Sequence, residues 1–239
     1  MTTLTKITVT ILLSLLLMSC INITPGVKGN GNVSTVDRTI EEDFNQVEVS
    51  RGLDVYLTQS DSPMLKVQAD ENLHDIIITE VENGVLKIYA DKNISTSESK
   101  KVMVNVKDLD LISATSGSDV FSTNTLEADA IKLITTSGAD LEVEINAEVT
   151  VLAATSGSDL KVSGTTSKLS ASATSGSDIK AGQLESQNCT ASVTSGAVII
   201  VRAEKSLSAS ATSGGDIKYL GNPEKVSKSD GVSGSIRKQ

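Results

Sequence analysis

Thr155-Ser-Gly-Ser-Asp-Leu160 and Thr174-Ser-Gly-Ser-Asp-Ile179 are near copies of one another, nineteen residues apart. With these two, the chain holds seven such phrases at nearly constant intervals, and successive glycines are separated by 18 to 21 residues. A fixed period near twenty residues is typical of a stacked repeat, in which each period forms one supersecondary unit. The repeated glycines are Gly117, Gly138, Gly157, Gly176, Gly196, Gly214 and Gly234.

Aliphatic and small polar residues alternate within one repeat, from Leu169 to Ile179, which is typical of strands with one buried face. We expect the aliphatic set to point inward, and glycine to supply a bend that a side chain would block. The fold class predicted is all-β, a parallel β-helix (solenoid) with about 18–21 residues per C-terminal coil. The alternation also places the serine before each glycine inside, bonded to a neighbouring carbonyl (Ser116, Ser137, Ser156, Ser175, Ser195 and Ser213).

The first residues differ in composition from the rest. Lys6 precedes an apolar run of about twelve residues, which is too short to span a bilayer and suits a secretory signal. The run ends at Leu17-Met18-Ser19-Cys20, which resembles a bacterial lipobox. We therefore predict a lipoprotein signal peptide at 1–19, lipidation of Cys20, and a flexible tether at 20–36. The alternative is an ordinary signal peptide with an incidental cysteine.

Two further segments follow. Residues 37–112 are predicted to form N-terminal β-helix coils with a hairpin at Asn83-Gly84, because Asn-Gly favours tight hairpin turns. Residues 113–239 are predicted to form the Thr-Ser-Gly repeat β-helix, closed by a polar C-terminal cap. Cys189 falls where other repeats carry Ile or Leu, so we expect it to be a small buried hydrophobe.

Composition argues against several functions. The formal net charge of −9 opposes nucleic-acid binding, which needs a basic face. His74 is the only histidine, so a Ser-His-Asp arrangement would rest on it alone. A carbohydrate-active β-helix enzyme is the alternative from another class, but the outer face predicted here offers only Phe121 as an aromatic platform. We expect no enzyme activity and no cofactor.

An acidic ladder is the sharpest candidate site. A Gly-x-Asp-hydrophobe pattern is typical of calcium-binding β-rolls, but here it occurs only once per coil. Lysines stand two residues after three of the aspartates, and the fifth repeat replaces acid and base together with Val198 and Ile200. We therefore expect an ion-paired, solvated ladder and no metal site; the weak candidates for a cation are Asp140, Glu142 and Asp159. The ladder contains Asp119, Asp140, Asp159, Asp178 and Asp216.

Two other surfaces have alternative readings. The outer threonines, one per repeat, form hydroxyl columns like those of ice-binding β-helices, although threonine also suits exposed strands. Val198 and Ile200 would place two apolar side chains on the outer face, either as a contact patch for a partner or under a loop.

The chain resembles the head GIN domain family of bacterial envelope proteins, described as autotransporter adhesin heads. The matching text is Gly31-Asn-Val33, Phe44-Asn-Gln-Val-Glu-Val49, Gly52-Leu-Asp-Val-Tyr-Leu-Thr-Gln59 and Gly84-Val-Leu-Lys-Ile88, followed by the Ser-Gly repeats. The resemblance covers roughly Val33 to the C-terminus. It implies a right-handed β-helix and an exported or surface location, and it brings no catalytic or binding residues.

The sequence thus favours a non-catalytic cell-envelope lipoprotein that presents a β-helical surface for adhesion or envelope assembly. The alternatives are the carbohydrate-active enzyme and a calcium-stiffened scaffold. The partners expected are a membrane, through the lipid anchor, and a protein or glycan surface, with a homo-oligomer also open. The location expected is the outer membrane, facing either the periplasm or the surface.

Overall fold

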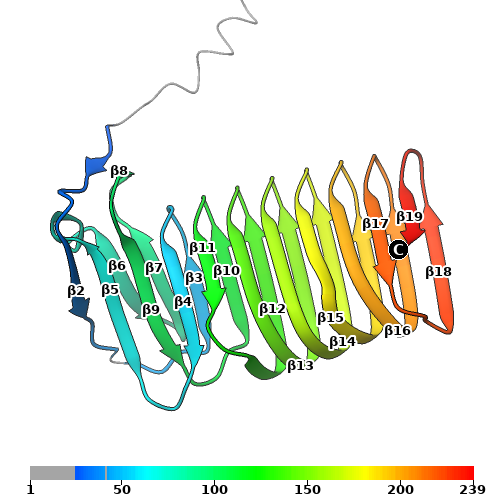
Figure 1. Ribbon diagram of the computed structural model, residues 1–239, viewed down its shortest axis with the longest axis horizontal. Coiled ribbons are helices and arrows are strands. Elements are labelled where there is room, and N and C mark those ends of the chain that lie inside the picture. The colour runs from blue at the N-terminus through cyan, green and yellow to red at the C-terminus, as the bar shows by residue number, and fades with distance from the viewer. Residues whose placement is uncertain (1–24, 41) are drawn as a thin grey trace, which may run out of the picture.

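The computed structural model describes residues 25–40 and 42–239. This part of the chain is an all-β solenoid of about seven turns, with parallel coils stacked along one axis (Figure 1). The predicted fold class is therefore confirmed. The predicted signal peptide and Cys20 lie outside the described residues. Within the described ranges, no helix is long and apolar enough to cross a membrane.

The N-terminal part is a mixed parallel and antiparallel region, which we call the head (residues 25–109). The outermost coil of the stack is formed by β7 and β9, which pair in parallel with β3 and β4. Antiparallel strands β6, β5 and β2 then cover that coil. The head contains β1 (Val27–Lys28), β2 (Val33–Asp37), β3 (Gln46–Val49), β4 (Asp54–Gln59), β5 (Met64–Asp70), the 3-10 turn η2 (Glu71–Leu73), β6 (Ile77–Glu82), β7 (Val85–Ala90), β8 (Ile94–Thr96) and β9 (Lys100–Val106).

The C-terminal part, residues 110–239, is wholly parallel, and we call it the repeat region. Paired positions in neighbouring coils differ by the period read from the sequence, as in Asp140 with Asp159 and Asp159 with Asp178. Its strands are β10 (Leu111–Thr115), β11 (Asp119–Ser122), β12 (Leu126–Thr136), β13 (Asp140–Thr155), β14 (Asp159–Thr174), β15 (Asp178–Val193), β16 (Val198–Ala211), β17 (Asp216–Leu220), β18 (Lys225–Asp230) and β19 (Ser235–Lys238).

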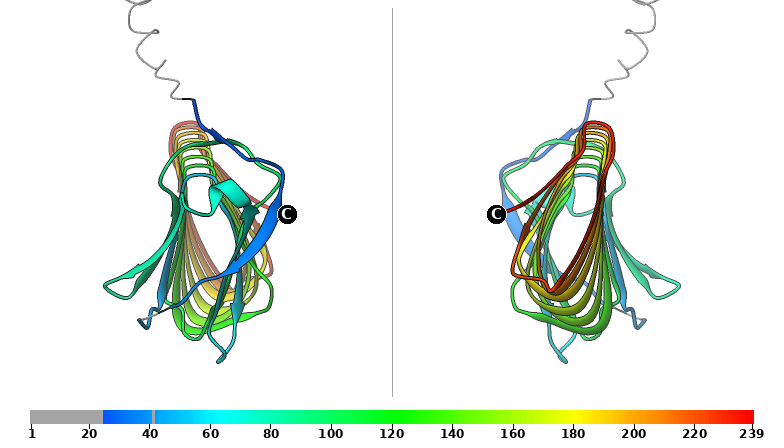
Figure 2. Two further views of the ribbon diagram at one scale, coloured as in Figure 1. Left: turned by 90° about the vertical axis from the view of Figure 1, so that its left-hand side faces the viewer. Right: turned by 90° about the vertical axis from the view of Figure 1, so that its right-hand side faces the viewer.

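Each coil is narrow at one edge, where its tight turn lies, and wider at the other (Figure 2). Small residues fill the narrow edge, for example Ala154, Ala173 and Ser177, all of them buried. The fit there is close, because a Cβ at Gly215 would lie 2.7 Å from Cγ1 of Val193. Val193 is larger than Ala173 in the coil before it, and Gly215 is correspondingly smaller than Ala197. The stack therefore keeps its volume by compensation between adjacent coils.

The turns at the narrow edge correct one prediction. Ser175 is exposed rather than inward, and it adopts a left-handed conformation with φ 57°, as does Gly176 with φ 69°. Two successive positive φ values make a type I′ turn, which breaks the alternation of the strands. The six serines expected inside, Ser116, Ser137, Ser156, Ser175, Ser195 and Ser213, all have positive φ and are exposed.

The buried serine follows the glycine instead. Ser177 is fully buried, and its hydroxyl donates to the carbonyl oxygens of Ala154 at 2.8 Å and Thr174 at 2.9 Å. The physical expectation, that a buried hydroxyl bonds a neighbouring carbonyl, therefore holds for a different serine. The hairpin predicted at Asn83-Gly84 is confirmed, with the same pair of positive φ values joining β6 and β7.

Part of the predicted tether at 20–36 is ordered, which corrects that prediction. Strand β1 pairs with β8, and β2 pairs with β5. Between them the buried carboxylate of Asp70 accepts hydrogen bonds from the backbone N–H groups of Gly31, Glu98 and Ser99 at 2.8 to 3.0 Å. Asp70 is distant in sequence, so nothing local in the Gly-rich text indicates that this segment is fastened.

The other end of the stack is β18 and β19. Lys228 and Asp230 occupy positions that are inward in the preceding coil, because they pair with Ala209 and Ala211. The ammonium group of Lys228 lies 4.8 Å from the centre of the Tyr219 ring. Charged groups at inward positions oppose the addition of another strand, as the predicted polar cap requires.

Candidate functional site

The acidic ladder lies on one face of the solenoid, directly after the type I′ turns. The predicted aspartates occupy equivalent positions in successive coils, and Val198 takes the place between Asp178 and Asp216. The structure adds Asp54 in the head, paired with Asp119. Arg51-Gly52 before it has the same positive φ values as the Ser-Gly turns, so the head holds a degenerate copy of the repeat. Only the glycine and aspartate of that copy could have revealed it in the sequence.

Two lysines on the ladder face form ion pairs with carboxylates of a neighbouring coil. Nζ of Lys180 lies 2.9 Å from Oδ2 of Asp159, and Nζ of Lys161 lies 2.6 Å from Oε1 of Glu142. Both lysines therefore pair with the preceding coil. Asp216 meets Lys218 of its own coil at 3.8 Å and Arg237 of the next at 2.6 Å. Such exposed pairs each contribute only about 0–1 kcal/mol, but they relieve repulsion along a column of carboxylates.

Among the weak candidates for a cation site, Asp140 and Asp159 are neighbours in register, while Glu142 and Asp159 are each bound to a lysine. Across residues 25–40 and 42–239, no group of three or more His, Cys, Asp or Glu side chains is placed to hold a metal ion. Asp119 is in no ion pair among the described residues, whereas Asp54 beside it pairs with Nζ of Lys100 at 3.9 Å. Burial, together with the charges of Asp54 and Asp140, raises the pKa of Asp119, and Lys100 opposes this rise.

His74 is the residue on which a catalytic triad would depend. Its Nε2 lies 3.0 Å from the hydroxyl of Ser34, and the ring is largely buried. Its Nδ1 is buried without a hydrogen-bond partner among the described residues, so no carboxylate orients the ring. A serine and a histidine thus meet, but the third group that a triad needs does not join them.

Tyr56 is an aromatic residue that the sequence did not place on the outer face. It stacks on Phe121, with ring centres 5.3 Å apart and an angle of 25° between the planes. The rings come from paired positions of β4 and β11. Each ring therefore covers one face of the other, and Nζ of Lys101 lies 5.8 Å from the centre of the Tyr56 ring.

The remaining predicted positions lie as follows. Val198 and Ile200 are half-buried on the outer face, and Ile200 lies between Lys180 and Lys218 in register. Outer threonine hydroxyls lie 3.3 to 3.5 Å from the serine hydroxyl that follows them in most of the turns, as in Thr136 with Ser137. Cys189 is a buried free cysteine, as predicted, and burial raises the pKa of its thiol to about 12.

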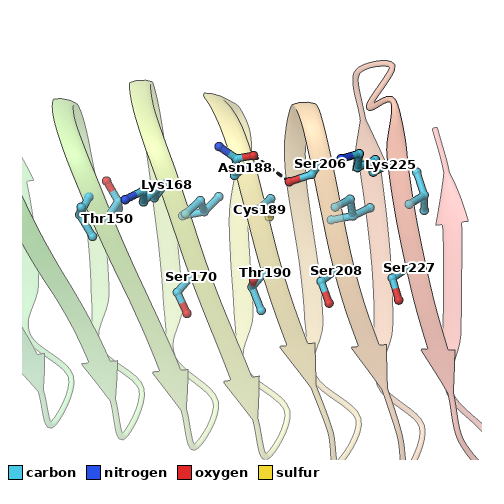
Figure 3. Close-up of a pocket in the computed structure, with 14 residues that line it drawn as sticks. Thr150, Lys168, Ser170, Asn188, Cys189, Thr190, Ser206, Ser208, Lys225 and Ser227 are labelled. Atoms are coloured by element: carbon cyan, nitrogen blue, oxygen red, sulfur yellow. Dashed lines mark hydrogen bonds between the residues drawn. The ribbon is translucent and has the colours of Figure 1, made fainter.

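The structure also shows a groove that sequence reasoning missed. It runs across the coils at the wider edge and has a volume of about 660 Å³ (Figure 3). Each of three successive coils contributes three consecutive residues: 168–170 from β14, 188–190 from β15 and 206–208 from β16. Val149 and Thr150 extend it at one end and 225–227 of β18 at the other. We call it the basic groove, because its only charged lining residues are Lys168 and Lys225.

Comparison with known proteins adds the following. A family model described as "Putative auto-transporter adhesin, head GIN domain" matches residues 43–223. No curated protein matches the chain. A crystal structure of a putative adhesin from Bacteroides fragilis is similar, with a TM-score of 0.83 and 22% identity over 90% of this chain and 100% of that one.

Two other solved structures share the fold. A putative lipid binding protein from Parabacteroides distasonis has a TM-score of 0.70 and 24% identity, covering 89% of this chain and 99% of that one. A putative adhesin from Parabacteroides merdae has a TM-score of 0.68 and 21% identity, covering 89% and 98%. The family model spans most of the chain, so this protein belongs to the head GIN domain family of putative auto-transporter adhesins.

Proposed function

We propose that this protein is a non-catalytic lipoprotein of the cell envelope, which presents its solenoid for adhesion or envelope assembly. The observation that carries the proposal is the stack of parallel coils, which holds equivalent outward positions of successive coils in register. A surface of this kind suits an extended partner better than a small substrate, because its polar groups are spread out rather than convergent. Membership of a family described as adhesins supports the same conclusion.

The lipobox-like Leu17-Met18-Ser19-Cys20 supplies the proposed anchor. Lipidation at Cys20 would attach the chain to a membrane, which we propose to be the outer membrane. The solenoid would then stand beside the membrane surface as a rigid column. The head, which follows the anchor in sequence, would be nearer to the membrane than the repeat region.

Metabolic labelling with an alkyne fatty acid tests the anchor. We expect the full-length chain to be labelled, Cys20→Ser to lose both the label and membrane association, and Cys189→Ser to keep both as the matched control. Labelled Cys20→Ser protein would contradict the proposed anchor.

Adhesion needs a separate test on intact cells. An antibody against the purified repeat region should label cells that express the full chain, and these cells should adhere to a glycan- or protein-coated surface more strongly than cells lacking it. Detection only after cell lysis, together with unchanged adhesion, would contradict the adhesive role. Turnover of an acidic polysaccharide by the purified protein would instead favour the enzymatic alternative.

A further inference from the structure

The basic groove has a charge unlike that of the rest of the molecule. The chain holds 30 acidic and 21 basic residues, yet none of the fourteen residues that line the groove is acidic. Neither Lys168 nor Lys225 lies in an ion pair with the described residues, whereas Lys161, Lys180 and Lys218 on the ladder face are all paired. The groove is therefore a local positive field in an acidic protein, and it favours an anionic ligand.

A third lysine continues the groove toward the head. Lys132 pairs with Val151, and Val151 pairs with Ser170 of the lining. Lys132 is exposed, one coil beyond Val151 and Thr150. Positive side chains thus recur along the direction in which the coils stack, at Lys132, Lys168 and Lys225.

Hydroxyl groups repeat along one wall of the groove. Ser170, Thr190, Ser208 and Ser227 occupy one column, one residue per coil, and none of their hydroxyls bonds another described residue. On the opposite wall, the Ser206 hydroxyl donates to Oδ1 of Asn188 at 2.8 Å (Figure 3). The coils are about 4.8 Å apart, close to the length of one pyranose unit in an extended chain. The wall therefore offers a hydroxyl at the repeat distance of a linear glycan.

The floor of the groove argues against other ligands. Leu169, Cys189 and Leu207 form it, and each is only 2 to 3% exposed, so these three side chains offer a ligand little of their own surface. The lining contains no aromatic residue, and its one exposed large aliphatic side chain is Val226 at 45%. A protein partner is usually held by bulky apolar or aromatic anchors, and an acyl chain needs an enclosed apolar cavity.

From these observations we infer that the basic groove binds a linear acidic glycan, laid along the solenoid axis with about one sugar unit per coil. Anionic groups of the glycan meet Lys168 and Lys225, and its hydroxyls bond the Ser170 column and the Asn188 amide. Few strongly hydrophobic contacts are made, so binding is weak per sugar, grows with chain length and falls with salt. This inference rests on the proposed adhesive function and gives it a ligand class and a site.

The test is calorimetric titration of the purified protein with oligosaccharides of galacturonate, alginate and chondroitin sulfate, each at least five units long. We expect saturable binding of at least one, weakened tenfold or more in Lys168→Gln/Lys225→Gln. The control Lys161→Gln/Lys180→Gln removes the same charge from the ladder face and should change the Kd less than twofold. Failure of all three acidic glycans to bind overturns the inference.

A second pair of variants separates contact from overall charge. Thr190→Glu places a carboxylate inside the groove, and Ser192→Glu places one on the same strand outside it; both positions are exposed. We expect only Thr190→Glu to abolish binding. Equal effects of the two, or equal competition by poly-glutamate, would overturn the groove as the site.

A cell-adhesion assay separates a failure of the glycan groove from a failure of the adhesive function. Adhesion that persists in full in Thr190→Glu overturns the glycan groove and leaves the adhesive function standing. Absence of adhesion in the unaltered protein overturns the adhesive function itself.

Discussion

The head and the repeat region build the same kind of coil in different ways. Large buried side chains fill the interior of both regions, such as Ile77 in the head and Leu133 in the repeat region, but in the head antiparallel strands close the open end. In the repeat region, small residues fill the narrow edge, and each coil is covered only by its neighbours. In the head, strands from distant parts of the sequence cover the coil. In the repeat region, each coil is covered by neighbouring coils of nearly the same sequence.

The two ends of the stack differ for the same reason. Strands β5, β6 and β2 cover the first coil, so its inward side chains are buried. The last coil has no such cover, and charged Lys228 and Asp230 stand at its inward positions. Covering strands thus close one end of the stack, and charged side chains at inward positions close the other.

Overfilling the narrow edge should give the largest effect. Gly215→Ala places a Cβ 2.7 Å from Val193 Cγ1, so we expect a loss of about 1–3 kcal/mol in the free energy of unfolding, measured by urea denaturation. Val193→Ala in the same chain should recover most of it, because the pair then matches Ala173 and Ala197 one coil earlier. Additive losses in the double variant would show that packing between coils is not the cause.

Removing the inward charges of the last coil should change the association state of the protein. Lys228→Val with Asp230→Val replaces inward charges with apolar β-formers, and we expect end-to-end dimers or longer assemblies in light scattering. The control is Lys225→Val with Ser227→Val, which alters outward positions of the same strand. A monomer at all concentrations for the inward variant would show that charge does not terminate the stack.

Two carboxylates, the buried Asp70 and the half-buried Asp119, should respond to pH in opposite directions. Burial acts to raise the pKa of Asp70, but backbone hydrogen bonds from Gly31, Ser99 and Glu98 outweigh it and hold the pKa below its ordinary value. Asp70 therefore stabilises the fold above its ordinary pKa, and this contribution is lost as pH falls through the lowered value. Asp70→Asn should be destabilising at pH 7 and less so in acid.

Asp119 has a raised pKa, so its charge opposes folding above that value, and the cost disappears as pH falls toward the ordinary pKa. Asp119→Asn should stabilise at pH 7 by less than about 1 kcal/mol, an advantage that shrinks in acid. Urea denaturation at pH 7, at pH 4 and again below the ordinary carboxyl pKa, at about pH 2.5, measures both variants. The same sign for both would contradict the assigned causes.

The residue at the first left-handed position of the turn can be exchanged between the head and the repeat region. The head hairpin uses Asn83 at the first left-handed position, and the repeats use serine. Asparagine tolerates this conformation better, so Ser156→Asn should stabilise and Asn83→Ser destabilise, each by on the order of 0.5 kcal/mol. Thermal denaturation measures both, and a loss of stability in Ser156→Asn would point to a role for the serine hydroxyl beyond the turn.

Calcium should have the smallest effect. Because Glu142 and Asp159 are engaged by lysines, we expect neither added calcium nor a chelator to shift the Tm. A rise with calcium that is lost in Asp140→Asn would revive the calcium-stiffened scaffold.

Most strands of the head could be predicted from alternation alone. Its stacking order could not, because β7 and β9 lie outside β3 and β4 although they come later in the chain. The acidic ladder was also predictable, apart from Asp54, whose turn is Arg51-Gly52 rather than Ser-Gly. The basic groove was not, because Lys168 and Lys225 are three periods apart and the two coils between them carry Asn188 and Ser206 at that position, so no lysine recurs from repeat to repeat.

The sequence by itself determined that this protein is a stack of coils, because a period near twenty residues with one glycine turn per period has few other solutions. It also determined the register of the ladder, since each aspartate follows its turn at a constant distance. Only the tertiary structure decided which serine is buried, how the first coil is covered, and that residues 27–37 are fastened to the head. These depend on left-handed turns and on contacts between distant segments, which no local pattern encodes.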